Sequence, residues 1–205
     1  MPDSHALLVD LLRHGEVAGR ECFRGSTDEP LSSNGWQQMQ RAVALNAPWQ
    51  RLLSSPLRRC AEFAEQLAND SDIPLSINPE LREIHFGDWE GQSAEEIFAK
   101  NPRILTGFFE DPINNMPPGA EPLEAFSARV LAAWQEIILS HRADRHLLLV
   151  SHGGPIRMII AHILGIPYNR LLNLEVPLAS ISRIRVNIAR DNAPFCSLAF
   201  HGRLP

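Results

Sequence analysis

Short, nearly continuous runs of Leu, Ile and Val, each followed by polar residues, constrain the fold of this chain more than any other feature. Residues 6–12 are apolar except at Asp10, residues 147–150 are wholly apolar, and residues 52–54 form a shorter run of the same kind. Such runs are typical of strands buried on both faces of a parallel sheet, because helices cover both sides. With helical patterns between them, they predict an α/β fold, a three-layer sandwich whose mostly parallel central sheet is flanked by helices.

Capping and turn residues indicate where the helices lie. Ser32 or Ser33 can cap a helix from about residue 35 to 45, and Ser55-Pro56 has the form of an N-cap and first helical residue. Pro122 is expected to open a long helix, and Gly165 to end one that starts after residue 152. Residues 75–77, 180–187 and 195–201 are expected to be further strands. The interval of about 79–121 is predicted to be a partly helical cover within a single domain of residues 1–205.

Composition limits the kinds of ligand and location that fit the chain. It has 205 residues with a formal net charge of -5, and an acidic chain is a poor general binder of nucleic acid. An anionic ligand would therefore need a local positive pocket. The apolar stretches are too short to cross a bilayer. The three cysteines lack CxxC spacing, which favours a reducing compartment such as the cytoplasm and argues against a zinc site. They are Cys22, Cys60 and Cys196.

Arginine and histidine residues, which can bind phosphate or accept a phosphoryl group, stand after the predicted strands. Arg13 and His14 follow the first strand, Arg59 follows the second, and His152 follows the strand at 147–150. Ligands of open α/β sheets bind at the carboxyl ends of the strands, so these side chains are expected to converge. Arginine suits phosphate oxygens, and a neutral imidazole is a competent nucleophile near pH 7. The second imidazole, if protonated, could neutralise another oxygen. Phosphoryl transfer through a phosphohistidine is the chemistry this set indicates.

Such a transfer also needs an acid that protonates the departing alcohol. Glu83 is the preferred residue, because apolar neighbours would favour its protonated form. The neighbours in question are Ile84, Phe86 and Trp89. The competing carboxylates are Glu16, Glu80 and Glu90. No HExxH, GxSxG or P-loop motif is present, which argues against a zinc hydrolase, a serine hydrolase and a nucleotide-binding loop.

These motifs resemble the histidine phosphatase superfamily, the phosphoglycerate-mutase-like group. The matching segments are LRHGE at 12–16, GxxDxPLSxxG at 25–35, SSPLxR at 54–59, the Glu83 segment and SHGG at 151–154. The resemblance implies a phosphoglycerate-mutase-like fold in which His14 is phosphorylated and Glu83 donates the proton. It also implies that Arg13, Arg59 and His152 hold the phosphoryl group. Arg20, Gly25 and Gly153 are further candidate substrate-binding residues. No metal or organic cofactor is implied.

Within this group the motifs are most similar to α-ribazole-5′-phosphate phosphatases of cobalamin nucleotide-loop assembly. The expected partner is a small phosphomonoester rather than nucleic acid or a membrane, and a homodimer is compatible. The alternatives are a phosphoglycerate mutase, a broad-specificity sugar-phosphate phosphatase, or a non-catalytic binder of phosphorylated ligands. Three positions depart from the family pattern: Arg20 replaces a frequent Asn, Phe63 replaces a common Thr, and Gly-Ala-Glu-Pro at 119–122 replaces Gly-Gly-Glu-Ser.

Overall fold

The computed structural model describes residues 6–44, 49–187 and 194–204, and within them the central sheet has six strands. The strands are β1 (Ala6–Arg13), β2 (Arg51–Ser54), β3 (Leu75–Ile77), β4 (His146–Ser151), β5 (Ile181–Asn187) and β6 (Phe195–Arg203). Their order across the sheet is β3-β2-β4-β1-β5-β6. Neighbours among β3, β2, β4 and β1 pair in parallel, whereas β5 pairs antiparallel with β1 and with β6. This confirms the predicted α/β fold with a mostly parallel sheet.

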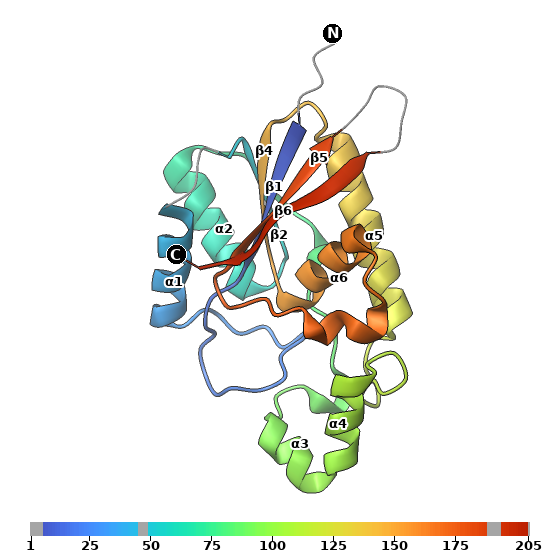
Figure 1. The fold of residues 1–205 in the computed structure, drawn as a ribbon. Coiled ribbons are helices and arrows are strands. Elements are labelled where there is room, and N and C mark those ends of the chain that lie inside the picture. The colour runs from blue at the N-terminus through green and yellow to red at the C-terminus, as the bar shows by residue number, and fades with distance from the viewer. Residues whose placement is uncertain (1–5, 45–48, 188–193, 205) are drawn as a thin grey trace.

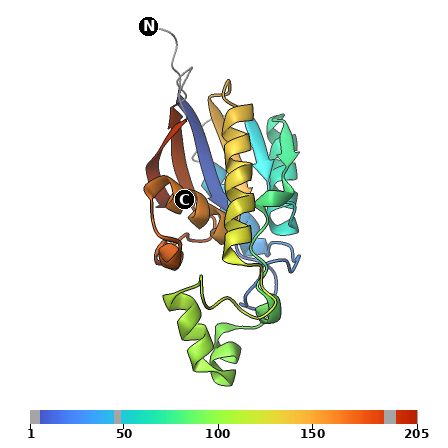
Figure 2. The ribbon, with the colours of Figure 1, turned by 90° about the vertical axis from the view of Figure 1, so that its right-hand side faces the viewer.

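Helices cover both faces of this sheet (Figures 1 and 2). The α-helices are α1 (Ser33–Ala44), α2 (Arg58–Ser71), α3 (Ala94–Lys100), α4 (Pro102–Glu110), α5 (Leu123–Ser140) and α6 (Gly153–Leu164). Short 3-10 helices are η1 (Pro79–Leu81), η2 (Gly87–Trp89) and η3 (Tyr168–Asn173). The helices α1 and α2 lie on one side of the sheet, and α5 and α6 lie on the other (Figure 1). None of the helices in the described part of the chain is long and apolar enough to cross a membrane.

The two helical layers explain why the strand runs are apolar at nearly every position. Leu147 and Leu149 of β4 belong to the core that contains residues of α5 and α6. Leu148 and Val150 belong to the second core, shared with α1 and α2. Since successive strand side chains point to opposite faces, a strand between two helical layers must be apolar on both.

Asp10 is the exception within β1 and is completely buried. Its carboxylate accepts hydrogen bonds from Arg183 Nε at 2.7 Å and Trp49 Nε1 at 2.9 Å, and it lies 2.9 Å from His146 Nε2. Burial raises the pKa of Asp10, but these hydrogen bonds outweigh burial and lower it below its ordinary value. The buried charge is thus compensated by partners on β5, β4 and the segment before β2.

The helix boundaries agree with most of the capping predictions. Ser32 Oγ accepts the Gly35 amide proton at 3.0 Å at the start of α1, while residue 45, the expected end of that helix, lies outside the described residues. Helix α5 follows Pro122, and α6 ends at Gly165, whose φ of 67° suits glycine. The prediction that Ser55 and Pro56 begin α2 is wrong, because α2 begins at Arg58 and Leu57 occupies its N-cap. The Ser55 hydroxyl accepts the Leu57 amide proton at 3.3 Å in the turn before α2, and it lies 2.7 Å from His152 Nε2.

Residues 79–121 contain η1, η2, α3 and α4. The pair α3–α4 projects beyond the sheet and its flanking helices, at the lower end of the molecule in both ribbon views (Figures 1 and 2). A small apolar cluster of its own holds this part together, with Trp89, Ile97, Leu105 and Phe108 buried in it. Phe23, from the loop after β1, packs against this cluster. The segment therefore contacts the loop that follows His14.

Candidate active site

Strand register brings the polar strand ends together. Arg13 of β1 pairs with Ser151 of β4, so the residues that follow them, His14 and His152, are neighbours. Their ring centroids are 5.2 Å apart. Ser54 of β2 pairs with Val150 of β4, which places Ser55 on the other side of His152. The carboxyl ends of three parallel strands thus meet at one place, as the strand-end argument predicts.

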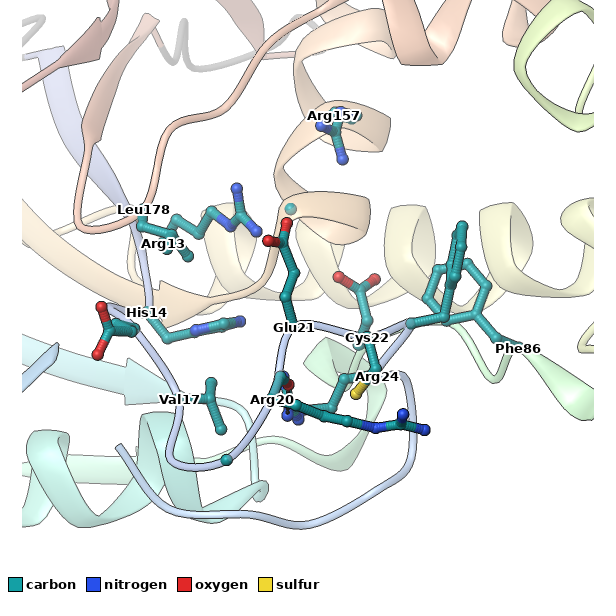
Figure 3. A pocket seen from close by; sticks show the side chains of 15 residues that line it. Arg13, His14, Val17, Arg20, Glu21, Cys22, Arg24, Phe86, Arg157 and Leu178 are labelled. Carbon is teal, nitrogen blue, oxygen red and sulfur yellow. Dashed lines mark hydrogen bonds between the residues drawn. The ribbon is translucent and has the colours of Figure 1, made fainter. Parts of the chain in front are cut away.

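A cavity of about 560 Å³ opens at this edge of the sheet (Figure 3). Its charged lining includes four arginines and three glutamates: Arg13, Arg20, Arg24, Arg157, Glu16, Glu21 and Glu83. His14, Gly153 and Phe86 also line it. In the described residues, no group of three His, Cys, Asp or Glu side chains is arranged as metal ligands. The arginines outnumber the glutamates by one, so this acidic chain has a cavity with a local excess of positive charge that suits an anion.

His14 is held in one tautomer. Its Nδ1 lies 2.8 Å from the Gly15 carbonyl oxygen, which can only accept, so Nδ1 carries the proton and Nε2 keeps a lone pair. Burial lowers the pKa of His14 well below its ordinary value, and the positive charges of Arg59 and Arg13 lower it further. The ring is therefore uncharged at pH 7, as a nucleophile must be.

Arg13 has a free donor beside this ring. Its Nη1 donates to the Val176 carbonyl, while its buried Nε has no hydrogen-bond partner within the described residues. Burial, followed by the charge of Arg157, lowers the pKa of Arg13 to about 10, so the guanidinium remains protonated at pH 7. A buried, unpartnered guanidinium N–H is costly unless an anion binds it. In Figure 3 the side chain lies directly above His14.

Arg59 and His152 are completely buried next to His14 and do not line the cavity. Arg59 Nε donates to His152 Nδ1 at 3.1 Å, and its terminal nitrogens donate to the carbonyls of Thr27 and Gly25 at 2.8 Å. Arginine cannot accept a hydrogen bond, so the proton of His152 is on Nε2, which donates to Ser55 Oγ. That both residues hold the phosphoryl group stays a prediction.

The expectation of a protonated second imidazole does not fit this environment. Burial lowers the pKa of His152 well below its ordinary value, and the charge of Arg59 adds to the effect. The neighbouring Cys60 thiol lies 3.6 Å from His152 Nε2 and is itself buried, which raises its pKa. His152 is therefore a neutral ring whose position Arg59 and Ser55 determine.

Glu83 lines the cavity with its carboxylate tied to backbone amides. Its Oε1 accepts from the Ile84 amide at 2.9 Å and its Oε2 from the Gly154 amide at 3.1 Å. A Cβ at position 154 would lie 2.1 Å from Oε1, so glycine is required there for this approach. Of the predicted apolar neighbours, Ile84 and Phe86 share a cavity wall with Glu83, whereas Trp89 packs in the α3–α4 cluster.

The competing carboxylates have other partners. Glu90 accepts hydrogen bonds from the amides of Gly25, Ser26, Thr27 and Phe86. Burial raises the pKa of Glu90, but these hydrogen bonds outweigh burial and lower it to about 2. Glu90 is therefore charged at pH 7, and it connects residues 25–27 to Phe86. The carboxylate oxygens of Glu16 bind Ser32 and Asn34, and Glu80 does not line the cavity. Glu83 is thus the best-placed acid of the four.

The remaining predicted substrate-binding residues have different surroundings. Arg20 lines the cavity, but its Nη1 pairs with Glu96 of α3 at 2.7 Å and its Nη2 donates to the Gly91 carbonyl. Gly25 lies outside the cavity lining, its amide bound by Glu90 and its carbonyl by Arg59. A Cβ there would lie 2.0 Å from the Ile84 carbonyl oxygen, so close packing accounts for this glycine. Gly153 lines the cavity between Arg13 and Arg157.

Two cavity arginines had no predicted role. Arg157 stands four residues after Gly153 on α6, a spacing that puts both on one helix face and is readable from sequence. Arg24 lies in the loop after β1, pairs with Glu29, and has no comparable signal. Two residues near Arg59 have structural surroundings. Arg58, which precedes it in the chain, is an exposed partner of Glu62, and Phe63, one of the departures from the family pattern, is a buried core residue beside Trp36.

Known proteins share this sequence pattern and fold. The histidine phosphatase superfamily (branch 1) matches residues 9–192. The adenosylcobalamin/alpha-ribazole phosphatase of Escherichia coli (strain K12) is 28% identical over 185 residues, covering 86% of this chain and 89% of the relative. A glucosyl-3-phosphoglycerate phosphatase of Mycolicibacterium vanbaalenii is 34% identical over 168 residues, covering 77% of this chain and 74% of the relative.

Solved structures give the same result. A mycobacterial glucosyl-3-phosphoglycerate phosphatase superimposes with a TM-score of 0.85 at 26% identity, covering 97% of this chain and 99% of that one. The alpha-ribazole phosphatase of Shigella flexneri gives a TM-score of 0.81 at 25% identity, with 96% of each chain covered. The sequence match and the shared fold agree with the arginine-lined cavity next to His14. The chain therefore belongs to the histidine phosphatase superfamily.

Proposed function

We propose that this phosphatase hydrolyses a small phosphomonoester through a phosphohistidine on His14, with α-ribazole 5′-phosphate as the favoured substrate. The observation that carries the proposal is that the lone pair of His14 Nε2 and the unpartnered Nε of Arg13 belong to residues that line the same cavity. A nucleophile and a phosphate-binding cation share one cavity wall, and Glu83 lies on the same cavity.

The reaction divides into two displacements. In the first, the Nε2 lone pair attacks phosphorus, the P–O bond to the alcohol breaks, and a protonated Glu83 gives its proton to the departing oxygen. In the second, water attacks the phosphohistidine, the P–N bond breaks, and the Glu83 carboxylate takes the water proton. Arg13 stabilises the charge on the phosphoryl oxygens in both steps. Inorganic phosphate and the alcohol are the products, and His14 is regenerated.

Support for the substrate comes from the relatives. Relatives named adenosylcobalamin/alpha-ribazole phosphatase are 28% and 33% identical to this chain. The glucosyl-3-phosphoglycerate phosphatase is 34% identical to this chain, so a sugar-phosphate or phosphoglycerate ester is the alternative substrate. A mutase would retain its product and return the phosphoryl group to it. A non-catalytic binder would need no proton donor such as Glu83.

The first test is turnover of p-nitrophenyl phosphate by the wild-type protein and His14→Ala. We expect the substitution to lower kcat by roughly 10³-fold or more, because no other group can form the covalent intermediate. The exposed His162 provides the matched control, and His162→Ala should retain wild-type activity. Wild-type protein without turnover between pH 5 and 8 would favour the non-catalytic binder.

The second test compares α-ribazole 5′-phosphate, ribose 5-phosphate and 3-phosphoglycerate. The first two share the same ester carbon and sugar, so a higher kcat/KM for the ribazole ester isolates recognition of its base. Equal values would remove α-ribazole 5′-phosphate as the favoured substrate while leaving the phosphatase reaction intact. An isomerised product without free phosphate would indicate the mutase.

The remaining expectations are part of the same proposal. We place the protein in the cytoplasm, with activity that needs neither metal nor organic cofactor and no nucleic-acid or membrane partner. A homodimer is included as the assembly to look for. Activity measured with and without a chelator, and sedimentation of the purified chain, test these points directly.

A further inference from the structure

A second, smaller cavity adjoins the active-site cavity. It has a volume of about 70 Å³, and Glu83, Phe86 and Arg157 line both spaces. The rest of its wall is apolar except for Gly154 and comes from four parts of the chain. These residues are Ile84, Phe108, Pro112, Met116, Leu123, Phe126, Leu171 and Leu172. We call this space the apolar slot.

The chemistry of the leaving group indicates which part of the substrate lies next to the slot. An acid that protonates the departing oxygen must be within hydrogen-bond reach of it, so the alcohol half begins beside Glu83. From there it extends either into the open cavity or into the slot. The open cavity carries most of the charged groups, including Arg20, Glu21 and Arg24. The slot has charge only where Glu83 and Arg157 border it.

Its lining makes the slot poor for water and good for hydrocarbon. The side chains of its wall are hydrocarbon with almost no hydrogen-bonding groups. They are also shielded from solvent: Phe126 is 2% exposed, and Leu123 and Leu171 are each 5% exposed. Water is stable in such a space only with several polar partners, whereas apolar ligands occupy apolar cavities readily. A cavity of about 150 Å³ accepts benzene, so 70 Å³ has room for about three carbon atoms.

We propose that the apolar slot is a specificity subsite that receives a small apolar group on the alcohol half of the substrate. The inference rests on the proposed function, because it takes Glu83 as the group facing the ester oxygen. The matching ligand class is a phosphomonoester whose alcohol half can turn a short aliphatic branch, or the edge of an apolar ring, into the slot. The hydroxyl groups of a sugar would lie in the open cavity instead, since in the slot they would lose their hydrogen bonds.

The test uses alkyl phosphates, whose leaving alcohols have similar basicity. We expect kcat/KM to rise from methyl to propyl phosphate by roughly tenfold or more, and to level off when the slot is filled. Glycerol 3-phosphate has the same three-carbon chain with two hydroxyls and should fall at least roughly tenfold below propyl phosphate. A flat alkyl series, or a preference for glycerol 3-phosphate, would overturn the proposal.

Substitutions in the wall separate the slot from the rest of the site. Leu172→Phe places extra carbon in the slot and should lower the propyl-to-methyl ratio of kcat/KM about tenfold. Met116→Ala enlarges the slot and should move the optimum to a longer chain. Leu131→Phe is the matched control, since Leu131 is half-buried on α5 outside both cavities, and its ratio should equal the wild-type value.

Each failure has its own pattern. An equal loss for methyl and propyl phosphate in Leu172→Phe would mean a general closure of the site and would contradict a subsite. A ratio that neither wall variant changes would also contradict it. Wild-type protein that hydrolyses neither alkyl phosphates nor p-nitrophenyl phosphate would instead refute the proposed function.

Discussion

At the residue scale, the proton positions around the two active-site rings follow from neighbours with a single hydrogen-bonding role. The Gly15 carbonyl can only accept, so His14 carries its proton on Nδ1. The Arg59 guanidinium can only donate, so His152 carries its proton on Nε2. The same two rings have lowered pKa values because they are buried near arginines. Geometry and burial together thus leave the proposed nucleophile, His14, uncharged with a free lone pair on Nε2.

Glu83 gives a prediction at the same scale. Glu83→Gln keeps the shape of the side chain but cannot supply a proton to the leaving alcohol. We expect kcat for alkyl phosphates to fall by about 10² to 10⁴-fold. The loss for p-nitrophenyl phosphate should be much smaller, because nitrophenolate departs without a proton. Steady-state kinetics with both esters measure the difference.

Glu80→Gln is the control for this experiment, since Glu80 is a nearby carboxylate that does not line the cavity. Its kinetics should match those of the wild-type protein. Equal losses for alkyl and nitrophenyl esters in Glu83→Gln would show that Glu83 positions the substrate rather than donating a proton.

At the element scale, the Asp10 cluster joins the parallel and antiparallel parts of the sheet. Asp10 on β1 binds Arg183 of the antiparallel strand β5 and contacts His146 of the parallel strand β4. These are the two neighbours of β1 in the sheet. Arg13 ends the same strand and His14 follows it, so the cluster supports the element from which these two candidate site residues project.

Asp10→Ala should therefore lower the free energy of unfolding by about 3–5 kcal/mol, because it leaves a positive guanidinium and buried donors without their acceptor. Urea denaturation measures the change. Asp144→Ala is the matched control, since it removes a peripheral ion pair with Arg51 and should cost at most about 1 kcal/mol. Equal losses in the two variants would contradict the role assigned to Asp10.

At the scale of the whole molecule, the buried rings make stability depend on pH. The pKa values of His14 and His152 are lowered in the folded protein, so the unfolded chain binds more protons below its ordinary histidine pKa of about 6.5. The free energy of unfolding should thus fall as the pH decreases through 6.5. Well below that value the slope is about 1.4 kcal/mol per pH unit for each ring.

Urea denaturation between pH 7.5 and 5 tests this linkage in a range where the lowered carboxyl groups Asp10 and Glu90 stay ionised. His152→Asn should reduce the slope, and His162→Ala, which removes an exposed imidazole, serves as the control. A free energy of unfolding that does not change over this range would show that both rings take up protons in the folded protein as readily as in the unfolded chain, which contradicts the lowered pKa values.

Sequence by itself determined most of the elements and which strand ends meet. Apolar runs predicted the strands, and Ser32 and Gly165 marked helix ends. His14 and His152, which follow β1 and β4, were predicted to lie close together, and they are neighbours in the structure. These features depend on neighbours a few residues apart, and parallel pairing necessarily brings strand ends together. The start of α2 was misplaced: Ser55 accepts the Leu57 amide proton in a turn before the helix and also contacts His152, a distant partner that no local pattern reveals.

Tertiary structure alone decided how the site residues are used. Gly25 is required by close packing, and Arg59 donates hydrogen bonds to groups of the protein itself, such as His152. Arg24 and Arg157 line the cavity. The apolar slot joins Phe86, Phe126 and Leu172 from separate segments. Such walls and proton positions arise from contacts between residues far apart in the chain, and these contacts exist only once the layers have packed together.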